Sequence, residues 1–387
     1  MPASRRTSIA LLCLVFAASS GSAAGAVTAS PRWDHPGYDA GDSFYNPDES
    51  GIVSGTVGGL AKTWSVTLRS ADESCLGAGS PVVRDGRVFV SDGLGISAYS
   101  ARTGVLGWSF TVVDPLDTTR PRLALDGGVL LAGTSSCRPS GSASELTALD
   151  VATGRIRWQT SLGQPMGSMV VDQGVVVVSG YSDIFDDAQT TAYRTADGRM
   201  LWSKEGYVAA DISAGGTVLI RELGGDSRAT TAVAIGTGVA RWTRTGDWFA
   251  QAADRDRLYV LGAGGDLCAL DPASGRTRWT VPIEADAEIK AGYWGDRLAI
   301  DGKRVYRAYR GAVEALDART GKRVWKTGAT GDPHQPILAG GLVYAGGSVR
   351  NATDGKPAGP SFTGDLVVTG AQLFQVGGHT LTAYAPR

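Results

Sequence analysis

Short apolar runs separated by tight polar turns recur along the chain. Residues 167–180, GSMVVDQGVVVVSG, contain two valine-rich runs on either side of an Asp-Gln-Gly turn. Residues 190–202, TTAYRTADGRMLW, contain two more runs around Ala-Asp-Gly. Runs that are apolar without alternation are typical of strands covered on both faces, and such turns are typical of hairpins. The pattern predicts units of four short antiparallel strands and an all-β fold.

A fixed signature marks the second hairpin of each unit. The stretch ALDVATGRIRW, residues 148–158, has five counterparts, each with a glycine four residues before a tryptophan. The steps between successive glycines are 50, 44, 40, 37 and 46 residues, a period that indicates one supersecondary unit used many times. Four strands per unit indicate a propeller blade. The set consists of Gly104, Gly154, Gly198, Gly238, Gly275 and Gly321 with Trp108, Trp158, Trp202, Trp242, Trp279 and Trp325.

The residues of this signature have a structural interpretation. A tight turn commonly needs a positive φ, which glycine adopts without steric cost. The aspartate four residues earlier, at Asp150, Asp271 and Asp317, can accept hydrogen bonds from turn N–H groups. The tryptophan falls on the outermost strand, where its ring is expected to pack against the next blade. We therefore interpret the signature as architecture rather than as a ligand site.

The ends of the chain settle the expected number of blades. A seventh turn, NATDGKPAG, has Asn351 and Gly355 in register, but Gly359 stands where the tryptophan is expected. The C-terminal residues supply three more strands, and LAKTWSVTL, which contains Trp64, supplies the fourth. Joining both ends in one blade closes the ring and leaves no open edge. The sequence predicts an eight-bladed propeller over residues 60–387, after a signal peptide at 1–26 and a lead-in at 27–59.

The N-terminal residues and the charge bear on where the protein acts. Arg5 and Arg6 precede an apolar run and the triplet Ala24-Gly25-Ala26, the pattern of a secretory signal peptide. No later run reaches the length of a transmembrane helix. The formal net charge is −1, which argues against nucleic acid as a partner. We expect a secreted or cell-envelope-associated monomer.

The repeat resembles that of the pyrroloquinoline-quinone-type (PQQ-like) β-propeller family, most closely at ALDARTGKRVW, residues 315–325. The lead-in is also similar to that family's, with Trp33, Gly37, the triplet Tyr45-Asn46-Pro47, Ile52 and Leu60. The resemblance covers nearly the whole mature chain. It implies an eight-bladed propeller, and the family includes quinone-dependent alcohol dehydrogenases, outer-membrane assembly scaffolds and exported proteins without known activity.

The resemblance leaves two functions open. The dehydrogenases place an adjacent Cys-Cys pair against the quinone and have long insertions between blades, whereas this chain has no Cys-Cys and short units. It also contains no Walker loop, HExxH or CxxC motif. The leading hypothesis is therefore an exported, non-catalytic propeller without a cofactor that binds a protein or cell-envelope partner. The alternative is an alcohol or sugar dehydrogenase that uses PQQ and Ca²⁺.

Two of the cysteines fall on loops that propeller topology places on one face. Cys75 precedes the first strand of one blade, and Cys137 follows the second strand of the next blade. An exported protein can retain a disulfide, so we expect a bond between them. The alternative is two free thiols. Cys268, within the strand LCAL, is expected to be a small buried residue.

The candidate site residues lie where the chain departs from the repeat. The aromatic residues outside the register fall on the same expected face as the two cysteines, as a binding surface or as packing at the channel mouth. An acidic loop, SDIFDD, is a weak candidate for Ca²⁺ through its carboxylates, the alternative being a solvated loop. The first group is Trp248, Tyr293, Trp294 and His334, and the second is Asp183, Asp186 and Asp187.

Overall fold

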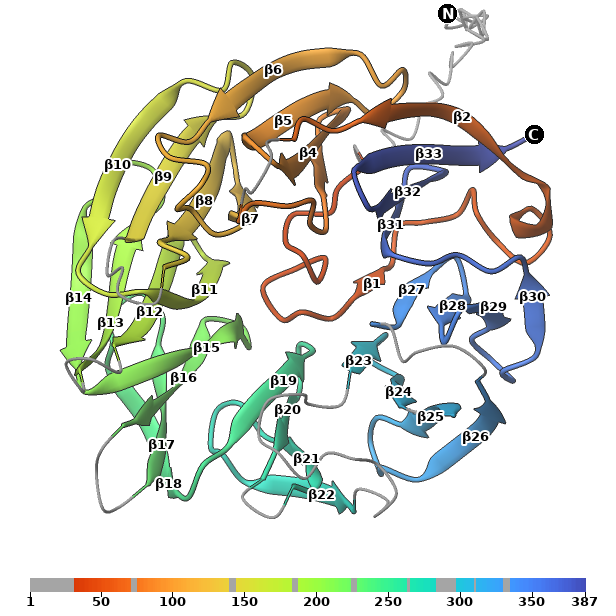
Figure 1. Ribbon diagram of the computed structural model, residues 1–387. Helices are drawn as coiled ribbons and strands as arrows, with labels where there is room; N and C mark the ends of the chain where they lie inside the picture. The colour runs from red at the N-terminus through yellow and green to blue at the C-terminus, as the bar shows by residue number, and fades with distance from the viewer. Residues whose placement is uncertain are drawn as a thin grey trace, which may run out of the picture.

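Eight antiparallel sheets are arranged around a central axis (Figure 1). The computed structural model describes residues 31–70, 75–138, 144–182, 187–223, 228–262, 265–282, 297–309, 311–329 and 335–387. Within these residues each sheet has four antiparallel strands, and one sheet has an additional short parallel strand. The predicted eight-bladed propeller is therefore confirmed.

The first four blades follow the chain without interruption, each running from the central axis to the rim. Blade 1 contains β3 (Val82–Arg84), β4 (Arg87–Asp92), β5 (Gly95–Ser100) and β6 (Leu106–Thr111). Blade 2 contains β7 (Arg122–Asp126), β8 (Val129–Ser135), β9 (Ser144–Asp150) and β10 (Ile156–Leu162). Blade 3 contains β11 (Met166–Asp172), β12 (Val175–Ser182), β13 (Asp187–Arg194) and β14 (Met200–Glu205). Blade 4 contains β15 (Tyr207–Ser213), β16 (Thr217–Glu222), β17 (Ala229–Ala234) and β18 (Ala240–Thr245).

The remaining blades include the two that take strands from the N-terminal part of the chain. Blade 5 contains β19 (Phe249–Ala253), β20 (Leu258–Leu261), β21 (Leu267–Leu270) and β22 (Thr277–Val281). Blade 6 contains β23 (Arg297–Ile300), β24 (Arg304–Tyr309), β25 (Ala312–Asp317) and β26 (Arg323–Gly328). Blade 7 contains β27 (Ile337–Ala339), β28 (Leu342–Ala345), β29 (Ser348–Asn351), β30 (Pro357–Gly359) and the extra strand β1 (Tyr45–Asn46). Blade 8 contains β31 (Asp365–Thr369), β32 (Gln372–Gly377), β33 (Thr380–Pro386) and β2 (Leu60–Thr67).

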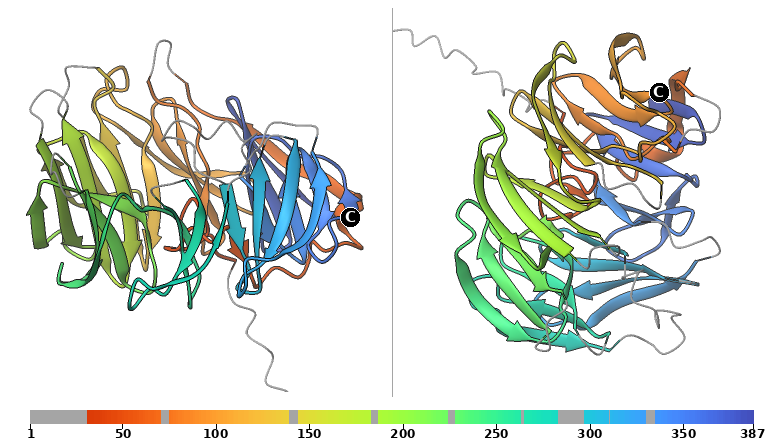
Figure 2. Two further views of the ribbon diagram at one scale, coloured as in Figure 1. Left: turned by 90° about the horizontal axis from the view of Figure 1, so that it is seen from below. Right: turned by 60° about the vertical axis from the view of Figure 1, so that its left-hand side comes forward.

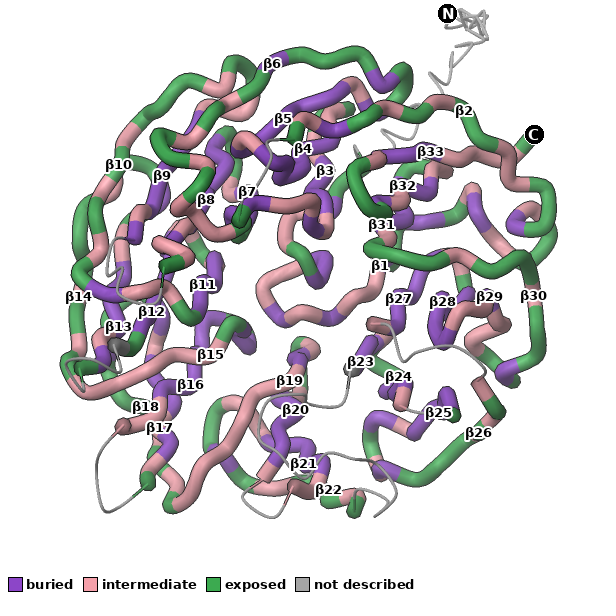
Figure 3. The backbone as a smooth tube through the Cα atoms, viewed as in Figure 1, coloured by how far each residue is buried: buried purple, intermediate pink, exposed green. Residues whose placement is uncertain are grey.

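The ring closes in blade 8 as the sequence predicts. Strand β2 pairs antiparallel with β33, and Trp64 lies opposite Ala383. The two middle strands of each blade are largely buried between neighbouring blades, whereas the outer strands are largely exposed (Figure 3). This arrangement explains why runs such as Val175–Val178 are apolar without alternation.

Each signature tryptophan joins its blade to the turn of the next blade. The indole N–H donates to a backbone carbonyl in that turn over 2.7–3.1 Å at all seven positions, from Trp64 to Trp325. The ring lies directly against the turn glycine, so that a methyl group at the glycine would approach ring atoms to 2.5–2.9 Å. Glycine is therefore required at these positions both by the ring and by its φ of 67–73°. The interpretation of the signature as architecture is confirmed.

The turn aspartates have the role that the sequence predicts. Asp150 accepts hydrogen bonds from the N–H groups of Ala152 and Thr153, and Asp271 and Asp317 make equivalent bonds. A hydrogen bond from Arg157 holds the pKa of Asp150 down to about 2. Where Ala234 replaces the aspartate, the glycine N–H still bonds to the residue four positions earlier, so the backbone turn forms without the carboxylate.

The interface between blades 7 and 8 has no tryptophan, and the lead-in takes its place. Buried Val57, in the 3₁₀ helix η1 (Val57–Gly59), lies against Gly359. Glu49 accepts hydrogen bonds from the N–H groups of Ile52 and of Ala371 in blade 8. The lead-in therefore seals the interface where the repeat is incomplete.

Residues 32–46, which we call the clasp, circle the central axis and bond to the inner strand of every blade in turn (Figure 1). Its backbone groups make the contacts to six blades, and side chains make those to blades 3 and 8. The donor–acceptor distances are 2.7–2.9 Å. From blade 1 to blade 8 the bonded pairs are Trp33 with Val83, Asp34 with Leu125, His35 with Val171, Ala40 with Ser213, Gly41 with Ala253, Ser43 with Ile300, Phe44 with Leu338 and Asn46 with Val368.

The contact between the tryptophan ring and the turn glycine predicts a specific loss of stability. Gly154→Ala places a methyl group 2.5 Å from the Trp108 ring at a φ of +70°. We expect a cost of about 1–2 kcal/mol from the left-handed backbone and about 1–3 kcal/mol more from overpacking. Gly86→Ala is the matched control, because Gly86 has a φ of +71° and no atom within 4 Å of the added methyl group. Urea unfolding of both variants measures the difference, and equal losses would contradict the proposed role of the ring.

Candidate functional site

The propeller has two faces, and the left view of Figure 2 shows the ring from its side. The clasp lies on the side of the turns between the first and second strands, which we call the clasp face. The opposite side carries the loops between the second and third strands and the connections from one blade to the next. We call it the loop face. Function on a propeller is expected at such loops, because the strands are occupied by packing.

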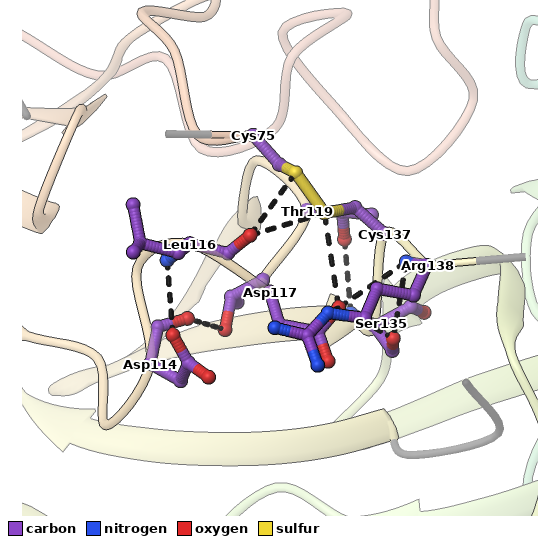
Figure 4. Close-up of a disulfide and its surroundings, with 10 residues drawn as sticks. Cys75, Asp114, Leu116, Asp117, Thr119, Ser135, Cys137 and Arg138 are labelled. Carbon is purple, nitrogen blue, oxygen red and sulfur yellow. Dashed lines mark hydrogen bonds and ion pairs between the residues drawn. A yellow bond between two sulfur atoms is a disulfide. The ribbon is translucent and has the colours of Figure 1, made fainter. Parts of the chain in front are cut away.

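A disulfide joins two neighbouring blades on the loop face (Figure 4). Cys75 and Cys137 are bonded, with Cα atoms 6.4 Å apart and 62 residues between them in sequence. The predicted pairing is therefore confirmed. Cys268 is buried in β21, as expected for a small core residue.

The disulfide braces the loop between β6 and β7, residues 112–121. Its two sulfur atoms lie 3.4 and 3.6 Å from the carbonyl oxygen of Leu116. Asp117 accepts hydrogen bonds from the Ser136 hydroxyl and the Arg138 N–H, and Thr119 donates its N–H to the Ser135 carbonyl. The hydrogen bond from Ser136 is the main cause that lowers the pKa of Asp117.

This braced loop presents apolar side chains to solvent. Val113 is 99% exposed and Leu116 is 50% exposed. A fully exposed valine contributes nothing to the core, and the covalent and hydrogen-bonded bracing limits the motion of the loop that carries it. The loop therefore offers an ordered apolar contact surface.

Trp248 lies on the loop face but is held in a packed arrangement. The Arg244 guanidinium stacks over the ring at 3.9 Å from its centroid, and the indole N–H donates to the Thr245 carbonyl. The ring also lies close to Gly262, since a methyl group on Gly262 would be 3.3 Å from a ring carbon. Of the two interpretations left open for this residue, the geometry favours packing.

The other candidates fall largely outside the described residues. Tyr293, Trp294 and His334 all do, as do Asp183 and Asp186 of the acidic loop. Asp187 is described and lies exposed at the start of β13. Among the described residues, no group of three or more His, Cys, Asp or Glu side chains is placed to hold a metal ion. No helix in this part of the chain is long and apolar enough to span a membrane.

The clasp gathers titratable groups that the sequence analysis did not single out. His35 donates from Nε2 to the Val171 carbonyl at 2.8 Å, and burial lowers the pKa of its imidazole. Asp39 accepts hydrogen bonds from Gly41 and Ser43, whereas burial raises the pKa of its carboxyl group. Burial, together with the nearby Asp211 carboxylate, raises the pKa of Asp42 well above its usual range.

The sequence contains some features that point to the polar surroundings of the clasp. Aspartate recurs at the end of several inner strands, at Asp126, Asp172, Asp254 and Asp301. The lead-in adds WDHPGYDAGD, which is dense in polar groups. Only the fold shows that the first three strand-end aspartates and the lead-in meet on the clasp face.

The described residues do not fit the quinone cofactor that part of the fold family uses. PQQ carries three carboxylates, and its binding requires cationic partners and a Ca²⁺ ligand set. The described residues contain no adjacent cysteine pair and no cluster of metal ligands. In the described part of the chain, the carboxyl groups of Asp42 in the clasp and Asp211 in β15 lie near the guanidinium of Arg122, so carboxylates outnumber cations there.

Short four-stranded blades joined by a tryptophan–glycine contact define a PQQ-repeat β-propeller. The chain belongs to the PQQ_2 family, described as outer membrane protein assembly factor BamB, whose model matches residues 59–184 and 145–353. It is 24% identical over 273 residues to outer membrane protein assembly factor BamB of Yersinia pestis. That match covers 62% of this chain and 67% of the Yersinia protein.

Solved structures show the same fold at low sequence identity. Quinohemoprotein alcohol dehydrogenase from Comamonas testosteroni matches with a TM-score of 0.64 and 15% identity, over 92% of this chain and 80% of that chain. BamB from Moraxella catarrhalis matches with a TM-score of 0.57 and 19% identity, over 84% of this chain and 99% of that chain. At these identities the likeness shows the fold alone.

The raised pKa of Asp42 predicts a pH-dependent effect on stability. Because the folded-state pKa exceeds the unfolded value of about 3.9, the contribution of this group is fully present below about pH 4 and is lost as pH rises through the folded pKa. Asp42→Asn removes the charge, so we expect the variant to gain stability relative to wild type as pH rises. Urea unfolding from about pH 4 to about pH 8 measures this. Exposed Asp256→Asn is the control, and a pH-independent difference at Asp42 would contradict the assignment.

Proposed function

We propose that the protein is an exported, non-catalytic propeller that binds a protein or cell-envelope partner through its loop face. One observation carries the proposal: a cross-blade disulfide and adjacent hydrogen bonds hold the exposed apolar residues Val113 and Leu116 in an ordered loop. Membership in the BamB family supports a binding role without catalysis.

Physical considerations favour protein binding at this loop. An exposed apolar side chain gains about 25 cal/mol for each Å² of apolar surface that a partner removes from water. Binding also costs less entropy when the loop is already ordered, and here a disulfide and several hydrogen bonds order it. Leu116, beside the disulfide, would lie at the centre of such a contact.

Site-specific photocrosslinking in the native cell envelope tests the proposal. A photoreactive residue at position 113 should form a discrete crosslinked product, because the partner is expected to cover Val113. Val239, which is 64% exposed on the clasp face, is the matched control position and should give no such product. Equal yields at the two positions, or none at either, would contradict binding at the loop.

A variant without the disulfide extends the same crosslinking experiment. Replacing Cys75 and Cys137 by serine keeps Val113 in place but releases the brace between the loops. We expect the crosslinking yield at position 113 to fall severalfold, since ordering the loop then adds to the cost of binding. Circular dichroism checks that the variant is folded.

The alternative is a quinone-dependent dehydrogenase, a class that shares this fold, as the Comamonas enzyme shows. One titration separates this alternative from a binding role. Because the described residues offer no fit to PQQ, we expect no saturable rise in melting temperature when PQQ and Ca²⁺ are added to the purified mature protein. We also expect no dye reduction with alcohols or sugars. Saturable stabilisation together with dye reduction would overturn the non-catalytic assignment.

A further inference from the structure

A cleft of about 380 Å³ opens on the clasp face, between the clasp and the inner turns of blades 1 to 5. The clasp forms one wall through residues 34–41, and strand ends such as Asp126 and Asp172 form the other. This volume lies within the range of about 300–1,000 Å³ that is usual for small-molecule sites. The cleft is separate from the disulfide-braced loop on the opposite face.

Polar atoms without partners concentrate at this cleft. Eight buried side-chain nitrogen or oxygen atoms lack a hydrogen-bond partner in the described part of the chain, and three of them belong to residues 34–38. These three are Asp34 Oδ1, His35 Nδ1 and the Tyr38 hydroxyl, and all three residues line the cleft. A buried polar group normally has a partner, so a group of three at one cleft marks a place where a ligand with hydrogen-bonding groups can bind.

All three groups can accept a hydrogen bond from a ligand. The Val171 carbonyl can only accept, so His35 Nε2 carries the proton and Nδ1 of the neutral ring is an acceptor. Asp34 uses Oδ2 to accept from Arg84, which leaves Oδ1 as a second acceptor. The Tyr38 hydroxyl can donate or accept. A ligand that satisfies this set must supply at least two donors.

The charged side chains around the cleft indicate whether a ligand should be a cation or an anion. Five aspartates and three arginines line it, so carboxylates exceed guanidinium groups by two. The Arg84 guanidinium is engaged by Asp34 and by the Gly127 carbonyl, which leaves it little capacity to hold an anion. The field in the cleft therefore favours a cation.

The backbone of the clasp is strained at the same place. Tyr38 has a φ of +80°, a conformation that an aromatic residue rarely adopts. The Asp34 N–H donates to the Tyr38 carbonyl and the Tyr38 N–H donates to the His35 carbonyl, and these two bonds fold the clasp back on itself and hold this conformation. Strain of this kind persists where the surrounding structure enforces it, and it is common at ligand sites.

We propose that this cleft binds a small organic cation with N–H donors, a primary ammonium or guanidinium group that donates to Asp34 and His35. The group could belong to a free amine or to a lysine or arginine side chain of a partner. Both sources share the same recognition chemistry, and the experiment distinguishes them.

Isothermal titration calorimetry of the folded protein tests the proposal with two probes. Agmatine represents the free cation, and acetyl-Gly-Arg-Gly amide represents a side chain presented by a peptide. Saturable binding of agmatine supports a free ligand, and saturation by the peptide alone supports a partner's side chain. Absence of saturable binding by both probes would overturn the proposal. Tetramethylammonium has one positive charge, as the arginine peptide does, but no N–H donors. Binding of tetramethylammonium as tightly as the probe that binds would also overturn the proposal.

Three variants locate the site. Asp34→Asn should weaken binding by about tenfold or more, through loss of one charge-assisted hydrogen bond. Tyr38→Phe removes a hydroxyl that lies beside the Arg32 guanidinium and lines the cleft, so it should weaken binding and change the melting temperature little. Asp256→Asn, an exposed residue of the same rim outside the cleft, should bind as wild type does. Unchanged affinity in both Asp34→Asn and Tyr38→Phe would place binding elsewhere and overturn the proposal.

Nuclear magnetic resonance of the His35 ring nitrogens tests the contact with His35 independently of the affinity. The Nδ1 resonance should shift on addition of the bound probe, because its lone pair then accepts a hydrogen bond. The Nε2 resonance should change little, since its bond to the Val171 carbonyl is retained. A Nδ1 resonance that stays fixed at saturation would overturn the assignment of His35.

Discussion

The contact between a tryptophan ring and the turn glycine of the next blade is the interaction on which the rest of the fold depends. It couples a hydrogen bond to close packing, and it recurs at seven of the eight interfaces between blades. Neither residue tolerates replacement alone, because a side chain at the glycine would occupy the volume of the ring. The signature is therefore retained from blade to blade, whereas the loop lengths differ.

The remaining interface shows what happens when this contact is missing. Gly359 stands in the tryptophan position, and Val57 of the lead-in packs against it. The same N-terminal segment forms the clasp, which bonds to all eight inner strands. One continuous segment thus seals the incomplete interface and ties the strand ends together. The clasp face of the ring depends on residues that lie outside the repeat.

The sequence predicted the parts of the structure that repeat, and missed the part that does not. The period of the glycines revealed the blades, and the unmatched strand around Trp64 revealed the closure. The pairing of Cys75 with Cys137 followed from the shared face of their loops. The clasp has no period, and its partners are backbone groups from Val83 to Val368. Only the folded ring brings these groups together, so the recurring strand-end aspartates could not by themselves show that a cleft forms there.

The two faces differ because different constraints act on them. On the loop face, a disulfide orders a loop whose outward side chains are apolar, which suits a contact that excludes water. On the clasp face, backbone hydrogen bonds order a segment whose side chains are polar and partly without partners, which suits a small ligand with hydrogen-bond donors. The repeated residues between the faces are occupied by packing. Because the blades hold both segments in one ring, a change confined to one face should leave the geometry of the other intact, and the two proposed binding functions can vary independently.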